Sequence, residues 1–204
     1  TLIYREIKRF LNVYNQTIIA PIINSFLFFT IFTVVFSRST GFQVDYKSFI
    51  ASGIIMMAML QNSYTNTQST ITTAKVLGFA IDVIIPPIPT RVLVFAFLIG
   101  GVARGLLVGL LSFTVLYFFA NFSLHSVPLL ILYAILACSV FSLIGVIFGA
   151  LSKNFDSATS FNTYFINPIT LLSGTFYSIS FLSPFWQKVI LFNPAFYLID
   201  GFRY

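Results

Sequence analysis

Long stretches without a charged residue dominate the hydropathy pattern of the chain. The first extends from Thr17 to Phe36, and a helix needs about 20 such residues to cross a bilayer. Similar apolar stretches predict four more spans, at 49–66, 92–122, 127–151 and 158–176. The third span is longer than a perpendicular helix requires, so we expect it to tilt or to begin partway along its stretch.

Residues 1–15 have an amphipathic pattern instead. Apolar residues recur there at helical spacing, and charged residues occupy the other side of the helix. This pattern is typical of a helix that lies in the membrane interface. The apolar positions are Ile3, Ile7, Phe10 and Tyr14, and the charged positions are Arg5, Glu6, Lys8 and Arg9.

The second predicted span becomes polar toward its end. Side chains that form hydrogen bonds gather there, and polar amides inside a bilayer need partners on neighbouring helices or a wet cavity. We therefore expect this end of the helix to face the interior of the bundle. The residues are Gln61, Asn62, Tyr64, Thr65 and Asn66.

A mixed polar segment at residues 67–91 connects the second and third spans. A short helix is predicted over residues 70–83, and it carries Lys75 and Asp82. Three prolines then stop the helix and force an extended stretch; they are Pro86, Pro87 and Pro89.

A further short helix is predicted after the fifth span. Ser183 and Pro184 have the residue types of a helix start, and Asn193-Pro194 ends the segment. The helix is too short to cross a bilayer, so we interpret it as a re-entrant or interfacial element, with Trp186 at the level of the headgroups.

Composition agrees with an all-α, polytopic membrane bundle. Of all residues, 58% are hydrophobic and 8% are charged, whereas a soluble domain has about 25% charged residues. The net charge of +6 could suggest nucleic acid, but the 11 basic residues are scattered and form no basic stripe. We expect contact with membrane lipid and no nucleic-acid partner.

Lysine and arginine also predict the orientation of the chain. Six of these residues fall on the side of the N-terminus and three on the other side, which favours a cytoplasmic N-terminus. The six are Arg5, Lys8, Arg9, Lys75, Arg91 and Lys153, and the three are Arg38, Lys47 and Lys188.

Catalytic chemistry is poorly supported by the sequence. The single histidine, His125, and the single cysteine, Cys138, cannot assemble a zinc site, and no glycine precedes a lysine as a phosphate-binding loop would require. We expect no metal, no cofactor and no enzyme activity. All five carboxylates fall in predicted loops or at interfaces, whereas ion-coupled transporters usually carry one inside the bundle. Transport by this chain would be passive or powered by another protein.

Arg104 is the one charge inside a predicted span. An arginine at a helix centre costs about 2.5–3.5 kcal/mol on insertion scales. Two interpretations stay open: contact with a substrate or a headgroup phosphate, or a packing role in which the guanidinium bonds to carbonyls or reaches the membrane surface.

Small residues repeat at helical spacing in the third and fourth spans. Such residues let helix backbones approach closely in lipid, so we predict tight packing there. They are Gly101, Gly105 and Gly109 in the third span, and Ala134, Cys138, Ser142, Gly145 and Gly149 in the fourth.

Several segments, in this order, resemble the type-2 permeases of ATP-binding-cassette exporters. The first are residues 81–91 (IDVIIPPIPTR) and 100–107 (GGVARGLL). Near the end follow residues 172–178 (LSGTFYS), 182–186 (LSPFW) and 200–203 (DGFR). The resemblance covers nearly the whole chain.

This resemblance implies six spans, a homodimer of permease subunits in the bacterial inner membrane, and a separate ATPase subunit on the cytoplasmic side. It also implies that the printed sequence is a fragment without the sixth span. Coupling to the ATPase would involve Lys75, Asp82, Pro86 and Pro87 within residues 67–91. An outer re-entrant element would include Pro184, Trp186, Asn193 and Pro194.

A passive channel or a scaffold-type membrane protein without an ATPase partner is the alternative. The substrate stays open between a drug, a lipid and a lipid-linked glycan.

Overall fold

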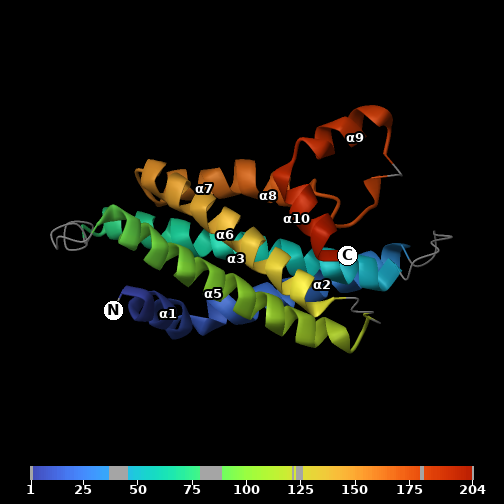
Figure 1. Cartoon of the computed structure of the whole chain (residues 1–204), viewed down its shortest axis with the longest axis horizontal. Coiled ribbons are helices and arrows are strands. Elements are labelled where there is room, and N and C mark those ends of the chain that lie inside the picture. The colour runs from blue at the N-terminus through green and yellow to red at the C-terminus, as the bar shows by residue number, and fades with distance from the viewer. Residues whose placement is uncertain are drawn as a thin grey trace.

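The computed structural model describes residues 2–36, 46–78, 89–120, 122, 126–179 and 182–203, and every regular element among them is a helix (Figure 1). The predicted all-helical fold is thus confirmed for this part of the chain. The elements are α1 (Leu2–Asn12), η1 (Asn15–Ile19), α2 (Ala20–Phe36), α3 (Tyr46–Val76), α5 (Thr90–Tyr117), α6 (Val127–Leu151), α7 (Phe155–Phe161), η2 (Asn162–Ile166), α8 (Asn167–Leu171), α9 (Pro184–Leu191) and α10 (Pro194–Arg203).

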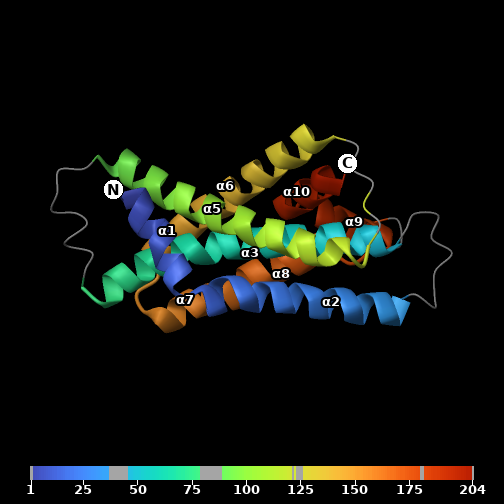
Figure 2. The same cartoon turned by 90° about the horizontal axis from the view of Figure 1, so that it is seen from below.

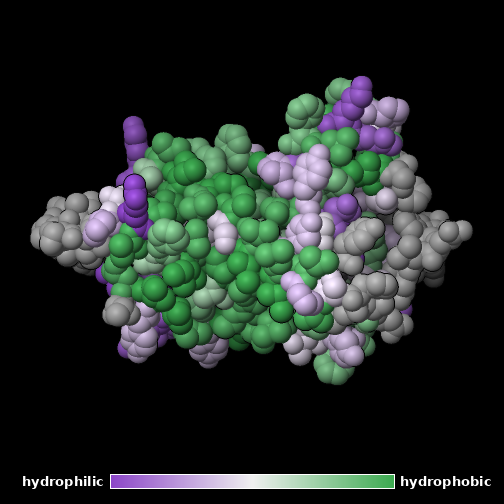
Figure 3. Space-filling model, viewed as in Figure 1, coloured by the Kyte–Doolittle hydropathy of each residue, from purple (hydrophilic) through white to green (hydrophobic). Residues whose placement is uncertain are grey.

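Within the part of the chain that the structure describes, three helices are long and apolar enough to cross a membrane, and they match the first, third and fourth predicted spans. They cover Asn15–Val35, Thr90–Tyr117 and Val127–Leu151. Their outer faces expose large apolar side chains, so one side of the molecule is hydrophobic along most of its length (Figure 3). A surface of this kind needs an apolar environment, which makes the chain an integral membrane protein.

α3 is the central helix of the bundle and packs along both α5 and α6 (Figures 1 and 2). The predicted end of the second span at Asn66 is wrong as a helix boundary, because α3 continues to Val76. Contacts of the turns after Asn66 explain why the helix continues. Thr67 Oγ1, for example, donates a 2.9 Å hydrogen bond to the Ser142 carbonyl of α6. Of the short helix predicted at 70–83, residues 70–76 form the end of α3, and residues 79–83 lie outside the described residues.

The polar end of the second predicted span faces the bundle interior, which confirms that prediction. Asn62, Tyr64 and Asn66 are buried, and Gln61 and Thr65 are half-buried. Some of them bond to other helices: Asn62 Oδ1 accepts from Arg104 of α5, and Asn66 accepts from Arg9 of α1. Gln61 Nε2 also donates to Thr170 Oγ1 at 2.9 Å.

Glycines of α5 and α6 allow α3 to lie between these two helices. A methyl group on Gly105 would clash with Ser63 Oγ of α3 and lie 3.1 Å from the Met59 carbonyl oxygen, and one on Gly145 would be 2.5 Å from the Tyr64 carbonyl oxygen. Gly101 faces Ser142 and the backbone of α3, Gly109 faces the Met59 side chain, and Gly149 faces the backbone of Gln68. The sequence predicted close packing of the third and fourth spans. The structure shows that most of these glycines instead make room for α3, which corresponds to the second predicted span.

The fifth predicted span, 158–176, corresponds to α7, η2 and α8, which run consecutively from Phe155 to Leu171. The helix ends five residues before the predicted boundary. The chain then turns at Gly174, whose φ of 70° is strained for residues with a side chain. The predicted short helix after this span is present as α9, which begins at Pro184.

Two side chains attach the C-terminal segment to the bundle. Asn193 Nδ2, between α9 and α10, donates to the Ile169 carbonyl at 2.7 Å. Arg203 of α10 donates to the Gly174 and Thr175 carbonyls at 3.0 and 2.9 Å, and its guanidinium lies 3.7 Å from the centre of the Phe49 ring. α10 therefore lies against the bundle, while α9 extends away from it (Figure 1).

Candidate functional site

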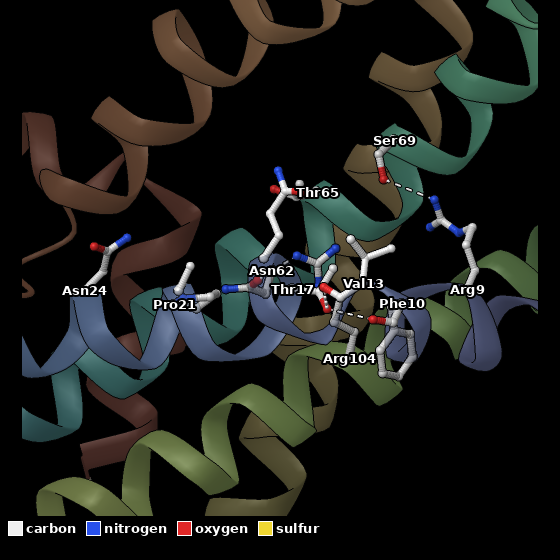
Figure 4. Close-up of a pocket in the computed structure, with 12 residues that line it drawn as sticks. Arg9, Phe10, Val13, Thr17, Pro21, Asn24, Asn62, Thr65, Ser69 and Arg104 are labelled. Carbon is white, nitrogen blue, oxygen red and sulfur yellow. Dashed lines mark hydrogen bonds between the residues drawn. The ribbon is translucent and has the colours of Figure 1, made fainter.

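A cavity of about 380 Å³ with a mixed apolar and polar lining lies between the N-terminal helices, α1 to α2, and the pair α3 and α5 (Figure 4). Most of its polar lining consists of amides and hydroxyls, together with two guanidinium groups. The lining residues are Arg9, Phe10, Val13, Gln16, Thr17, Ala20, Pro21, Asn24, Asn62, Thr65, Ser69 and Arg104.

Arg104 of α5 is the buried cation of this cavity, with 7% of its surface exposed. Its Nη2 donates a 3.0 Å hydrogen bond to Asn62 Oδ1 of α3, and its Nε has no partner among the described residues. A buried charge is stable only when it is paired or well hydrogen-bonded. A single amide oxygen compensates this guanidinium only in part, so the cavity carries excess positive charge.

Arg9 of α1 is better supplied with partners than Arg104. Its Nη2 donates to both the carbonyl and the side-chain oxygen of Asn66, at 3.0 and 3.2 Å, and its Nη1 lies 3.5 Å from Ser69 Oγ. Its Nε is 3.5 Å from Glu6 Oε2. Burial lowers the pKa of Arg9, Glu6 opposes this shift, and Arg5 adds to it. Asn66 and Glu6 together fix this guanidinium at the edge of the cavity.

Glu6 is a residue whose role the sequence did not reveal. We placed it among the charged residues opposite the apolar positions of the first helix, yet only 2% of its surface is exposed. It packs against α5 at Gly100, where a methyl group would approach its Cβ to 2.9 Å. The spacing of Glu6 and Arg9, three residues apart on one helix, was the available signal for an ion pair.

The sequence-predicted site residues fall into separate places. Arg104 lines the cavity, whereas Lys75 lies at the end of α3, where its Nζ donates to the Ala150 and Ser152 carbonyls, both at 2.6 Å. Asp82, Pro86 and Pro87 lie outside the described residues. The residues of the predicted re-entrant element belong to α9 and the start of α10; they are Pro184, Trp186, Asn193 and Pro194.

The side chains that line the cavity are suited to binding a ligand. Within the described ranges, no three metal-binding side chains come together, and the lining contains no carboxylate, histidine or cysteine. Guanidinium groups, amides and hydroxyls suit the recognition of an anion through charge-assisted hydrogen bonds.

Comparison with known proteins decides the family. The ABC-2 type transporter family matches the chain over residues 1–204. The chain belongs to this family. The resemblance to type-2 permeases that the sequence motifs indicated is thereby confirmed.

Individual relatives of this ABC-2 permease agree with the family. The inner membrane transport permease YadH of Escherichia coli K12 is 38% identical over 202 residues, which cover 98% of this chain and 79% of YadH. YadH of Escherichia coli O157:H7 and of Shigella flexneri match with the same identity and coverage. No solved structure matches the chain. As a member of a permease family, the chain is a membrane transport protein and not itself a catalyst.

Proposed function

We propose that this ABC-2 permease is the membrane subunit of an ATP-binding-cassette export system, and that a separate subunit hydrolyses the ATP. The observation that carries the proposal is the link that Lys75 makes between the ends of α3 and α6. This link lies at the end of the bundle where an ATPase would have to act.

Three parts of the chain lie at that end of the molecule: the C-terminal end of α3, the N-terminal end of α5 and the junction of α6 and α7 (Figures 1 and 2). Helix α3 has 31 residues, so it is about 45 Å long. A displacement at its Lys75 end would therefore reach both α6 and the buried polar residues near Asn62. This is the mechanical requirement for coupling an external ATPase to a membrane bundle.

The remaining parts of the proposal are based on the family and on the sequence predictions. The excess of lysine and arginine at this end supports a cytoplasmic N-terminus. We propose that α3 and the helical run from Phe155 to Leu171 are the second and fifth of six spans. Their polar residues would be shielded from lipid by neighbouring helices. We also propose a homodimer in the bacterial inner membrane, with α9 and the start of α10 as part of its outer re-entrant element.

Co-purification tests the proposal directly. The permease is isolated from its native membrane and the co-purifying ATPase subunit is identified by mass spectrometry, and a variant replaces residues 75–82 with a Gly/Ser linker. We expect wild-type permease to retain the ATPase in detergent and the linker variant to lose it, while the variant still inserts into the membrane. Retention of the ATPase by the linker variant would show that this segment is not the coupling site.

A passive channel would behave differently in reconstituted vesicles. We expect vesicles with permease alone to remain tight to small ions and dyes. Leakage from such vesicles without ATPase or ATP would favour the channel.

A further inference from the structure

The cavity extends from the start of the first span toward the middle of the bundle. On the first span its lining comes from Thr17, Ala20 and Pro21, close to the start of Asn15–Val35, and from Asn24 farther along. The start of the span is where α1 joins it (Figure 2). Lipid headgroups occupy the boundary layer of a bilayer, so a headgroup would enter the cavity from this end and reach inward to Arg104, near the middle of α5.

The charges of the cavity favour an anion. Arg9 has Glu6 as a counter-ion, whereas Arg104 has only the Asn62 amide oxygen and leaves its Nε free among the described residues. In Figure 4 the Arg104 guanidinium lies beside Asn62 and Thr17, within the cavity. A phosphate oxygen there would supply the charge and the acceptors that Arg104 lacks.

The surroundings of the cavity favour an occupant with an apolar tail. Its volume of about 380 Å³ is within the range of about 300–1,000 Å³ that is usual for small-molecule sites. Large apolar side chains nearby in the N-terminal part of the chain are about half exposed: Val13 at 49%, Tyr14 at 54%, Ile23 at 52% and Leu27 at 50%. Acyl chains could lie against this surface while a headgroup fills the cavity.

We propose that this cavity binds the phosphate group of an anionic membrane lipid, with the headgroup between Arg104, Arg9 and Asn62 and the acyl chains along α2. The bound lipid would fasten α1 and the start of α2 to α3 and α5. The lining of the site includes neither Lys75 nor any other residue of the 75–82 segment, so lipid binding can be tested independently of ATPase coupling.

Lipid retention tests this site. Purified full-length permease is exchanged into detergent with equal amounts of phosphatidylglycerol and phosphatidylcholine, and bound lipid is measured by native mass spectrometry. We expect selective retention of phosphatidylglycerol by wild type. Loss of one charge-assisted contact in Arg104→Gln should lower that retention roughly tenfold.

Arg5→Gln is the matched control for this variant. It removes an exposed charge of the same helix that carries Arg9, and it should retain the lipid.

A second pair of variants keeps both arginines. Ala20→Phe fills the cavity from α2, while Val35→Phe adds a ring at the other end of the same helix, at an exposed position that does not line the cavity. We expect Ala20→Phe to lose phosphatidylglycerol and Val35→Phe to keep it. This pair decides the question if Arg104→Gln fails to fold.

Three results would overturn the proposal. The first is equal retention of the two lipids by wild type, and the second is unchanged phosphatidylglycerol retention in Ala20→Phe. The third is displacement of the lipid by millimolar inorganic phosphate, because this would show a site for free anions rather than for a lipid.

Discussion

Thr70 on α3 donates a 2.9 Å hydrogen bond from its hydroxyl to the buried carboxylate of Glu6 on α1. The two residues are 64 positions apart in the chain. Glu6 also approaches Arg9, which lines the cavity, and Thr70 directly follows the lining residue Ser69 on α3. The position of α1 and the shape of the cavity are therefore coupled.

Replacement of Glu6 should detach α1 from the bundle. Glu6→Ala removes the acceptor of Thr70 and the counter-ion of Arg9, and hydrogen bonds to a charged group contribute about 1.5–3 kcal/mol. We expect faster amide hydrogen exchange in residues 2–12, with exchange in α6 unchanged. Lys8→Ala on the same helix is the control, and equal exchange in the two variants would contradict the structural role of Glu6.

Replacement of Asn62 should destabilise the protein, because Asn62 is the one hydrogen-bond partner that the described residues offer Arg104. Asn62→Ala should lower the free energy of unfolding by about 1.5–3 kcal/mol, measured as a lower midpoint of thermal unfolding in detergent. Asn62→Asp should preserve stability better, because the carboxylate pairs with the guanidinium. The same charge should weaken phosphatidylglycerol retention, and a variant with unaltered retention would argue against an electrostatic site.

Two glycines of α6 should differ in their tolerance of a methyl group. Gly145→Ala would place its Cβ 2.5 Å from the Tyr64 carbonyl oxygen, whereas Gly149→Ala meets the Gln68 carbonyl oxygen at 3.1 Å. Overpacking of this kind costs about 1–3 kcal/mol, so Gly145→Ala should unfold at a clearly lower temperature. Gly149→Ala should remain within about 1 kcal/mol of wild type, since alanine also favours a helix. Equal stability of both variants would show that α3 does not lie this close to α6.

Lys75 should stabilise the end of α6. Its ammonium group binds the carbonyls of Ala150 and Ser152, and a cation at a helix C-terminus contributes about 0.3–1 kcal/mol. Lys75→Met should therefore increase hydrogen exchange in residues 148–154, and Lys75→Arg should restore protection in part. If only ATPase binding changes in Lys75→Met, the residue contacts the partner and not α6.

The arrangement around Glu6 shows where sequence reasoning reached its limit. The amphipathic pattern correctly predicted a helix at the N-terminus, because helical spacing is a local property. Which side of that helix meets protein and which meets lipid depends on neighbours that are distant in sequence. Gly100 and Thr70 create the space and the donor for Glu6, and neither could be assigned to it from the sequence.

The sequence by itself determined the helical membrane class, the spans with uniformly apolar residues and the inward orientation of the polar residues at 61–66. These properties follow from the cost of exposing polar groups to lipid and from a periodicity within each helix. Only the tertiary structure decided that α3 continues to Val76, that the glycines of α5 and α6 both receive α3, and that Arg104 and Arg9 share one cavity. The physical reason is that helix ends and packing partners depend on contacts between separate segments, and hydropathy along the chain carries no information about these contacts.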